Sequence, residues 1–127
     1  MALRHASAAL LLIVGVPSLA AGPTPTEILA RDILGELVAM DTFRNGEAGG
    51  TRPAAERLAA MLIRANFPAG DIQVLGLTPD DGNLIARYRS ANPAQPPVLM
   101  LAHLDTVSTS PESWNTNPLE LVEKDGY

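Results

Sequence analysis

The residues best suited to chemistry are His103 and Asp105, which directly follow an apolar run. Val98 to Ala102 are five consecutive apolar residues, a pattern typical of a buried strand. Open α/β sheets bind ligands at the carboxyl ends of such strands. On extended backbone, residues i and i+2 project from the same face, so the imidazole and the carboxylate would lie together. Imidazole is the commonest metal ligand, and a neighbouring carboxylate can orient it or coordinate too. The pair therefore predicts a metal site.

The number of available ligands limits that site. A catalytic zinc usually takes three protein ligands and a water. The chain has two histidines, His5 and His103, and no cysteine. His5 lies in a segment that we expect to be removed, and only Asp105 among the carboxylates has suitable spacing. We therefore expect that this chain does not complete a metal site alone. From the residues alone, a purely structural His103–Asp105 pair stays open as an alternative.

The N-terminus has the pattern of an export signal. Arg4 and His5 precede an apolar run from Ala8 to Val16, and small residues follow at Ser18 and Ala20. This order predicts a signal peptide over residues 1–20 that is cleaved to leave residues 21–127. The apolar run is too short for a membrane anchor, so no stable membrane insertion is expected after cleavage. An exported chain without cysteine favours a periplasmic or secreted location.

Composition narrows the class of partner. The 127 residues are 46% hydrophobic and 18% charged, which is typical of a folded domain or part of one. The net charge is −5, and the arginines are spread along the chain, with Lys124 as the only lysine. Because nucleic-acid binding needs a concentrated positive surface, we expect no nucleic-acid partner.

The first predicted helix begins after the signal. Thr24 can act as N-cap, Pro25 suits the first helical position, and Glu27 completes a capping box. The helix is predicted to end near Met40. Its apolar residues recur with helical spacing: Ile28, Leu29, Ile33, Leu34, Leu37 and Val38.

A glycine-rich connection over residues 45–50 leads to the second helix. Thr51 and Pro53 provide its start signals, and it is predicted to run to about Asn66. The predicted buried stripe of this helix comprises four residues: Leu58, Met61, Leu62 and Ala65.

Strands are predicted in the second half of the chain. Residues 72–75 and 83–88 alternate in polarity and flank the turn signal of residues 79–82. Residues 98–102 form the predicted central buried strand, and residues 119–123 a last short one. The predicted fold class is therefore α/β, with two helices packed on a sheet.

The final residues indicate an interrupted hairpin. Asp125 and Gly126 are a turn signal, and a hairpin turn needs a second strand. The sequence ends at Tyr127. We therefore expect this chain to be the truncated N-terminal part of a larger domain.

Three segments together resemble a known family. They are His-x-Asp-x-Val at residues 103–107, Trp-x-x-x-Pro at 114–118, and the acidic-basic-Asp-Gly-Tyr turn at 123–127. In this combination the chain resembles the di-zinc aminoacylase and carboxypeptidase family, which includes acetylornithine deacetylase, succinyl-diaminopimelate desuccinylase and glutamate carboxypeptidase. The resemblance spans about residues 26–127. One departure is Leu119, where the family often has Phe; this changes packing rather than chemistry.

The resemblance implies a fold, a reaction and a site. The fold is the N-terminal part of a three-layer, zinc-peptidase-like domain with a mixed sheet and flanking helices. His103 is implied as a ligand of one of two zinc ions, and Asp105 as the catalytic-site carboxylate that holds the imidazole. The implied reaction is hydrolysis of peptide or N-acyl amino acid bonds, in which the metal ions activate a water and polarise the carbonyl. The other ligands, the general-base Glu and a domain for possible homodimerisation would lie beyond residue 127.

Two alternatives stay open. The chain could be a non-catalytic periplasmic binding or interaction module, in which His103 and Asp105 form only a hydrogen-bonded pair, or a fragment with no activity of its own. Other residues have plainer interpretations. Trp114 is expected to be a packing anchor under its loop, and Asp80 and Asp81 to be solvated in their turn.

Overall fold

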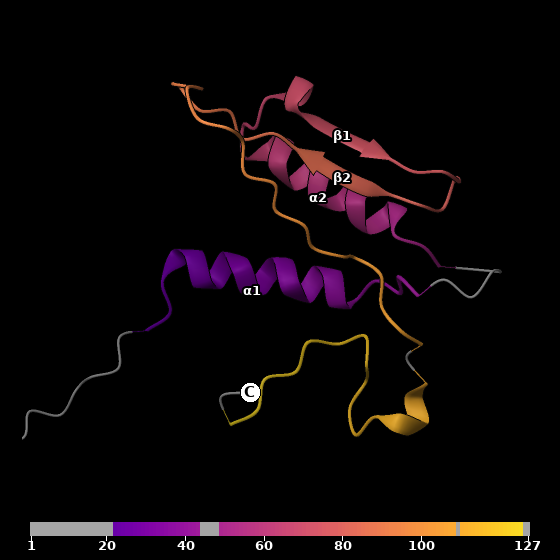
Figure 1. Ribbon diagram of the computed structural model, residues 1–127. Coiled ribbons are helices and arrows are strands. Elements are labelled where there is room, and N and C mark those ends of the chain that lie inside the picture. The colour runs from indigo at the N-terminus through magenta and orange to yellow at the C-terminus, as the bar shows by residue number, and fades with distance from the viewer. Residues whose placement is uncertain (1–21, 44–48, 109, 126–127) are drawn as a thin grey trace, which may run out of the picture.

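The computed structural model describes residues 22–43, 49–108 and 110–125. The predicted signal peptide over residues 1–20 lies outside this range. The described elements are listed here in chain order: α1 (Pro25–Val38), α2 (Arg52–Arg64), the 3-10 turn η1 (Ala69–Asp71), β1 (Ile72–Leu75), β2 (Asn83–Ala86) and the 3-10 turn η2 (Pro111–Ser113). Figure 1 shows α2 packed against the β1–β2 hairpin, with α1 as a separate layer. The described chain is therefore mixed α/β, as predicted. The expectation that both helices pack on the sheet is wrong, since α2 makes the extensive contact with the hairpin and α1 does not.

The start of α1 is confirmed in detail. Thr24 is the N-cap, its hydroxyl accepts a hydrogen bond from the Glu27 N–H, and the Glu27 carboxylate accepts one from the Thr24 N–H at 2.7 Å. The helix ends at Val38, two residues earlier than predicted. No residue of α1 is buried, and Leu29 and Leu34 are at least half exposed. Ile33, Leu37 and Val38 are half-buried, so the apolar side of α1 is partly covered within the described residues.

The core lies between α2 and the hairpin. β1 and β2 pair antiparallel, with Ile72 opposite Ala86 and Leu75 opposite Asn83. The most buried side chains are Ala54 and Ala55 in the first turn of α2. The predicted stripe farther along α2 is only partly right: Leu58, Met61 and Leu62 are half-buried and Ala65 is exposed.

Small residues are buried because the backbone of the hairpin loop approaches α2 closely. A Cβ built on Gly82 would collide with the Arg52 backbone and lie 3.1 Å from the Ala55 side chain. Larger side chains would not fit between helix and loop, so alanine and glycine fill this contact.

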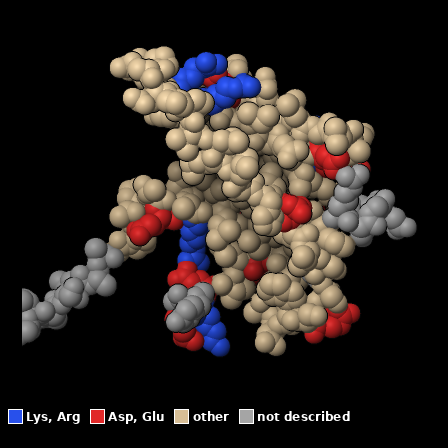
Figure 2. All heavy atoms as spheres, viewed as in Figure 1, with Lys and Arg blue, Asp and Glu red and all other residues tan. Residues whose placement is uncertain are grey.

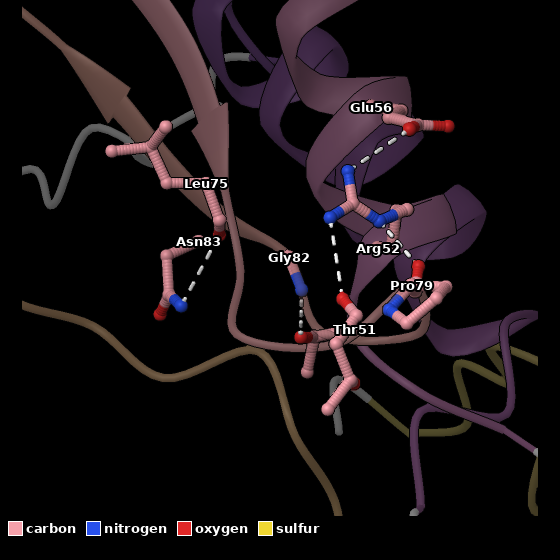
Figure 3. A network of polar contacts seen from close by, with 8 residues as sticks. Thr51, Arg52, Glu56, Leu75, Pro79, Gly82 and Asn83 are labelled. Atoms are coloured by element: carbon pink, nitrogen blue, oxygen red, sulfur yellow. Dashed lines mark hydrogen bonds and ion pairs between the residues drawn. The ribbon is translucent and has the colours of Figure 1, made fainter.

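Polar groups also stabilise the contact between α2 and the hairpin loop (Figure 3). The Arg52 guanidinium donates to the carbonyls of Pro79 and Thr78 and forms an ion pair with Glu56 at 3.6 Å. The Thr51 hydroxyl accepts a hydrogen bond from the Gly82 N–H at 2.9 Å. The N-terminus of α2 and the hairpin loop therefore form one unit.

An ion pair between the buried Asp71 and the exposed Arg89 closes the other end of the hairpin. Asp71 is 7% exposed, and its carboxylate accepts hydrogen bonds from Arg89 Nε at 2.7 and 2.9 Å. The Asp71 carbonyl accepts from the Arg87 N–H at 2.9 Å. The hydrogen bonds from Arg89 lower the pKa of Asp71, and the positive charges of Arg89 and Arg87 add to that effect while burial opposes it.

The predicted central strand at residues 98–102 is wrong. These residues belong to no sheet, and Val98 and Leu101 are more than four-fifths exposed. In Figure 1 the orange stretch around them runs as an irregular trace between the hairpin layer and α1. A strand requires a neighbour for its N–H and C=O groups, and within the described residues β1 and β2 pair only with each other.

The short strand predicted at residues 119–123 is also wrong. This segment returns along α1 instead, where the Leu121 side chain packs against Gly35 and Glu123 forms an ion pair with Arg31. Asp125 occupies a left-handed turn conformation, with φ 53°. None of the described helices has the length and apolarity needed to cross a membrane.

Candidate metal-ligand site

His103 and Asp105 lie in contact, as their spacing predicts. His103 Nδ1 is 2.8 Å from the Asp105 carbonyl oxygen and 3.3 Å from its carboxylate Oδ1. Both side chains are well exposed, at 84% and 69%. The contact is therefore formed at the surface rather than at the end of a buried strand.

The geometry selects one form of the imidazole. A carbonyl oxygen can only accept a hydrogen bond, so His103 Nδ1 carries the proton in this contact. In the neutral ring Nε2 then has a free lone pair. Metal-ligating histidines are commonly held this way, with the second ring nitrogen bonded to a carbonyl or carboxylate.

Thr42 connects this pair to the rest of the fold. Its hydroxyl donates to the Leu104 carbonyl at 2.8 Å, and a second hydrogen bond of 3.3 Å joins it to the Thr106 hydroxyl. Thr42 is 3% exposed. Nothing in the local pattern around Thr42 identifies this partner, which lies 62 residues away in the sequence.

A hollow of about 750 Å³ lies beside the pair. One side is formed by residues 83–86 of β2, the other by residues 100–105, and Gly50 and Thr51 close one end. The hollow is thus the space between the exposed apolar segment and the uncovered edge of the hairpin. The imidazole and the carboxylate lie at its border.

The described residues supply only part of a metal site. No group of three or more His, Cys, Asp or Glu residues comes together within residues 22–43, 49–108 and 110–125. Asp81 also lines the hollow, but its carboxylate accepts a hydrogen bond from the Thr78 hydroxyl at 2.8 Å. One imidazole with its orienting carboxylate does not make a complete zinc site.

Four other polar or aromatic residues outside the His103–Asp105 pair show ordinary local contacts. Trp114 is 52% exposed and is not a buried anchor. Asp80 is exposed as predicted, whereas Asp81 is half-buried and bonded to Thr78. Ser110 donates its hydroxyl proton to Glu112 in the following turn, which lowers the pKa of that glutamate.

The charged side chains show no concentrated positive area on the face in Figure 2. Lys and Arg there form two separate groups, each beside carboxylates. Ion pairs among the described residues include Arg89 with Asp71 and Arg57 with Glu36. The hydrogen bond from Arg57 lowers the pKa of Glu36.

Comparisons with protein-family models, with curated proteins and with solved structures find no match for this chain.

Proposed function

We propose that this chain is the N-terminal part of the catalytic domain of an exported, zinc-dependent amidohydrolase that cleaves peptide or N-acyl amino acid bonds. The motifs around residues 103–107, 114–118 and 123–127 support the family. The observation that carries the proposal is the contact between His103 Nδ1 and Asp105, because it leaves the lone pair of Nε2 available to a metal in the neutral ring.

The two residues would have distinct tasks. His103 would bind one zinc ion through Nε2. Asp105 would hold the imidazole in the Nδ1–H form and increase its basicity. Bound zinc supplies a water of lowered pKa and a polarised carbonyl in this class of hydrolase. Further ligands and a general base are needed for that chemistry, and the described residues do not provide them.

The exposed apolar segment also supports a larger domain. Val98, Leu99, Met100 and Leu101 are each 79–88% exposed. A contiguous apolar stretch of this kind marks a surface that another element covers. In the proposed protein, further strands of the catalytic sheet would cover it.

The same segment favours one alternative, an interaction module without catalysis. Its exposed side chains would then bind a protein partner, and the His103–Asp105 pair would be only a local hydrogen bond. Zinc content separates the two possibilities, since an interaction module needs no metal.

The test uses the protein purified from its natural source with its native metal. Zinc is measured by elemental analysis, and hydrolysis by amine release from a panel of N-acyl amino acids and dipeptides. We expect zinc and hydrolysis of at least one substrate class, both absent after chelation and restored by zinc. A protein that holds no zinc and cleaves none of the panel contradicts the proposal. The isolated 127-residue chain is expected to bind zinc poorly and to be inactive.

A further inference from the structure

Thr42 is a buried polar residue next to an exposed pair. Its hydroxyl donates to the carbonyl of Leu104, and it is joined to the Thr106 hydroxyl. These two bonds lie on either side of Asp105. Within residues 98–107, Leu104 is half-buried and all the other residues are exposed. The segment is therefore anchored where Thr42 meets it.

The shorter hydrogen bond, from the Thr42 hydroxyl to the Leu104 carbonyl, restricts the residue that contacts the imidazole. The Leu104 carbonyl belongs to the same planar peptide unit as the Asp105 N–H. Holding that plane restricts where the Asp105 backbone and side chain can lie. These are the groups that meet His103 Nδ1, at 2.8 Å through the carbonyl and 3.3 Å through the carboxylate.

We infer that Thr42 is a positioning residue for His103. By fixing the peptide between Leu104 and Asp105, it keeps the acceptor groups of Asp105 on Nδ1 and so favours the Nδ1–H tautomer of the neutral ring. What Nε2 then binds rests on the proposed function. The orientation of the ring does not, because it requires no metal.

The inference is tested by nitrogen NMR of the His103 imidazole in the full chain, at a pH where the ring is neutral. Long-range proton–nitrogen correlations report the ratio of the Nδ1–H to the Nε2–H tautomer. Wild type is expected to favour Nδ1–H. Thr42→Val removes the hydroxyl and should lower the ratio roughly threefold to tenfold, the size expected for one hydrogen bond. Thr42→Ser keeps the hydroxyl and should retain most of the ratio.

Thr78→Val is the matched control. It removes a threonine hydroxyl that bonds Asp81 in the hairpin loop, so it should leave the His103 ratio unchanged. An unchanged ratio in Thr42→Val overturns the inference, as does an equal loss in Thr42→Ser or in Thr78→Val. If Thr42→Val unfolds the chain, Thr42→Ala provides the second test. It also removes the hydroxyl that bonds the Leu104 carbonyl and should lower the ratio in the same direction; an unchanged ratio there overturns the inference.

This experiment is independent of zinc. A chain that never binds zinc can still show the Thr42 effect, and a zinc enzyme can lack it. Failure of the positioning role and failure of the proposed function are therefore distinguishable.

Discussion

The α2–hairpin unit, residues 51–89, and the extended segment, residues 98–107, are built in opposite ways. The unit joins neighbouring elements through strand pairing, buried alanines and the Asp71–Arg89 ion pair. Among the residues that the structure describes, the segment pairs with no strand, and it exposes its apolar side chains and is held by Thr42 at Leu104. The residues suited to chemistry lie in the less supported region. Substitutions in the unit are therefore expected to change the free energy of unfolding. Substitutions in the segment are expected to change binding instead.

The largest stability effect is expected inside the unit. Ala55 is fully buried against the hairpin loop, with the Gly82 backbone close to its Cβ. Ala55→Leu adds volume to a filled contact and should lower the free energy of unfolding by about 1–3 kcal/mol. Urea denaturation followed by circular dichroism measures this. Ala60→Leu is the control, because Ala60 is exposed on the same helix; equal losses in both variants would show that the contact is not tightly packed.

The largest binding effect is expected in the extended segment. Asp105→Asn keeps the size of the side chain and the 2.8 Å contact between His103 Nδ1 and the backbone carbonyl, but removes the carboxylate charge 3.3 Å from Nδ1. Loss of such a carboxylate typically weakens metal affinity about 10-fold to 100-fold. Competition with a zinc chelator measures the affinity of the native protein. A zinc affinity equal to that of wild type would mean that the Asp105 carboxylate does not orient the His103 imidazole.

The Asp71–Arg89 ion pair makes the stability of the unit depend on pH. Because the folded-state pKa of Asp71 is lowered, the pair contributes stability above the unfolded-state pKa of about 3.9. That contribution is lost as the pH falls through the lowered folded-state value. Asp71→Asn should therefore destabilise the chain at neutral pH and flatten the acid limb of its stability profile. Melting temperatures between pH 7 and pH 2 measure it, with Asp80→Asn, an exposed carboxylate of the same hairpin, as the charge control.

The smallest effect is expected from an apolar residue in the extended segment. Leu99 is 79% exposed, so Leu99→Ser should change the free energy of unfolding by no more than about 0.5 kcal/mol. The same denaturation experiment applies. A loss comparable to that of Ala55→Leu would show that Leu99 is buried in solution and that the two regions are not as different as the structure indicates.

Local signals predicted much of the fold. The capping box at Thr24 and the strands predicted at residues 72–75 and 83–88 depend on residues close in sequence. The capping box and the first strand are confirmed, and the second strand ends two residues early, at Ala86. The strand predicted at residues 98–102 is wrong because an apolar run shows that a segment can be buried, not that a partner strand is present. The backbone at Gly82 lies so close to α2 that only small side chains fit between them, and alanines therefore form the core there. The spacing of large apolar residues along the helix cannot reveal such a contact.

The candidate site, like the fold, could be predicted from the sequence only in part. The His103–Asp105 contact follows from i, i+2 spacing and was predictable. The role of Thr42 was not, because its hydrogen bond to Leu104 joins residues 62 positions apart. Only the three-dimensional fold brings those groups together.

If His103 is a zinc ligand, its replacement should lower the zinc stoichiometry of the native protein. His103→Ala is compared with His5→Ala in the native protein by elemental analysis after removal of loosely bound metal. His5 lies in the predicted signal peptide, so its replacement should leave the zinc content at the wild-type level. We predict that His103→Ala loses zinc relative to wild type. Equal zinc content and equal chelator resistance in the two variants would contradict the account.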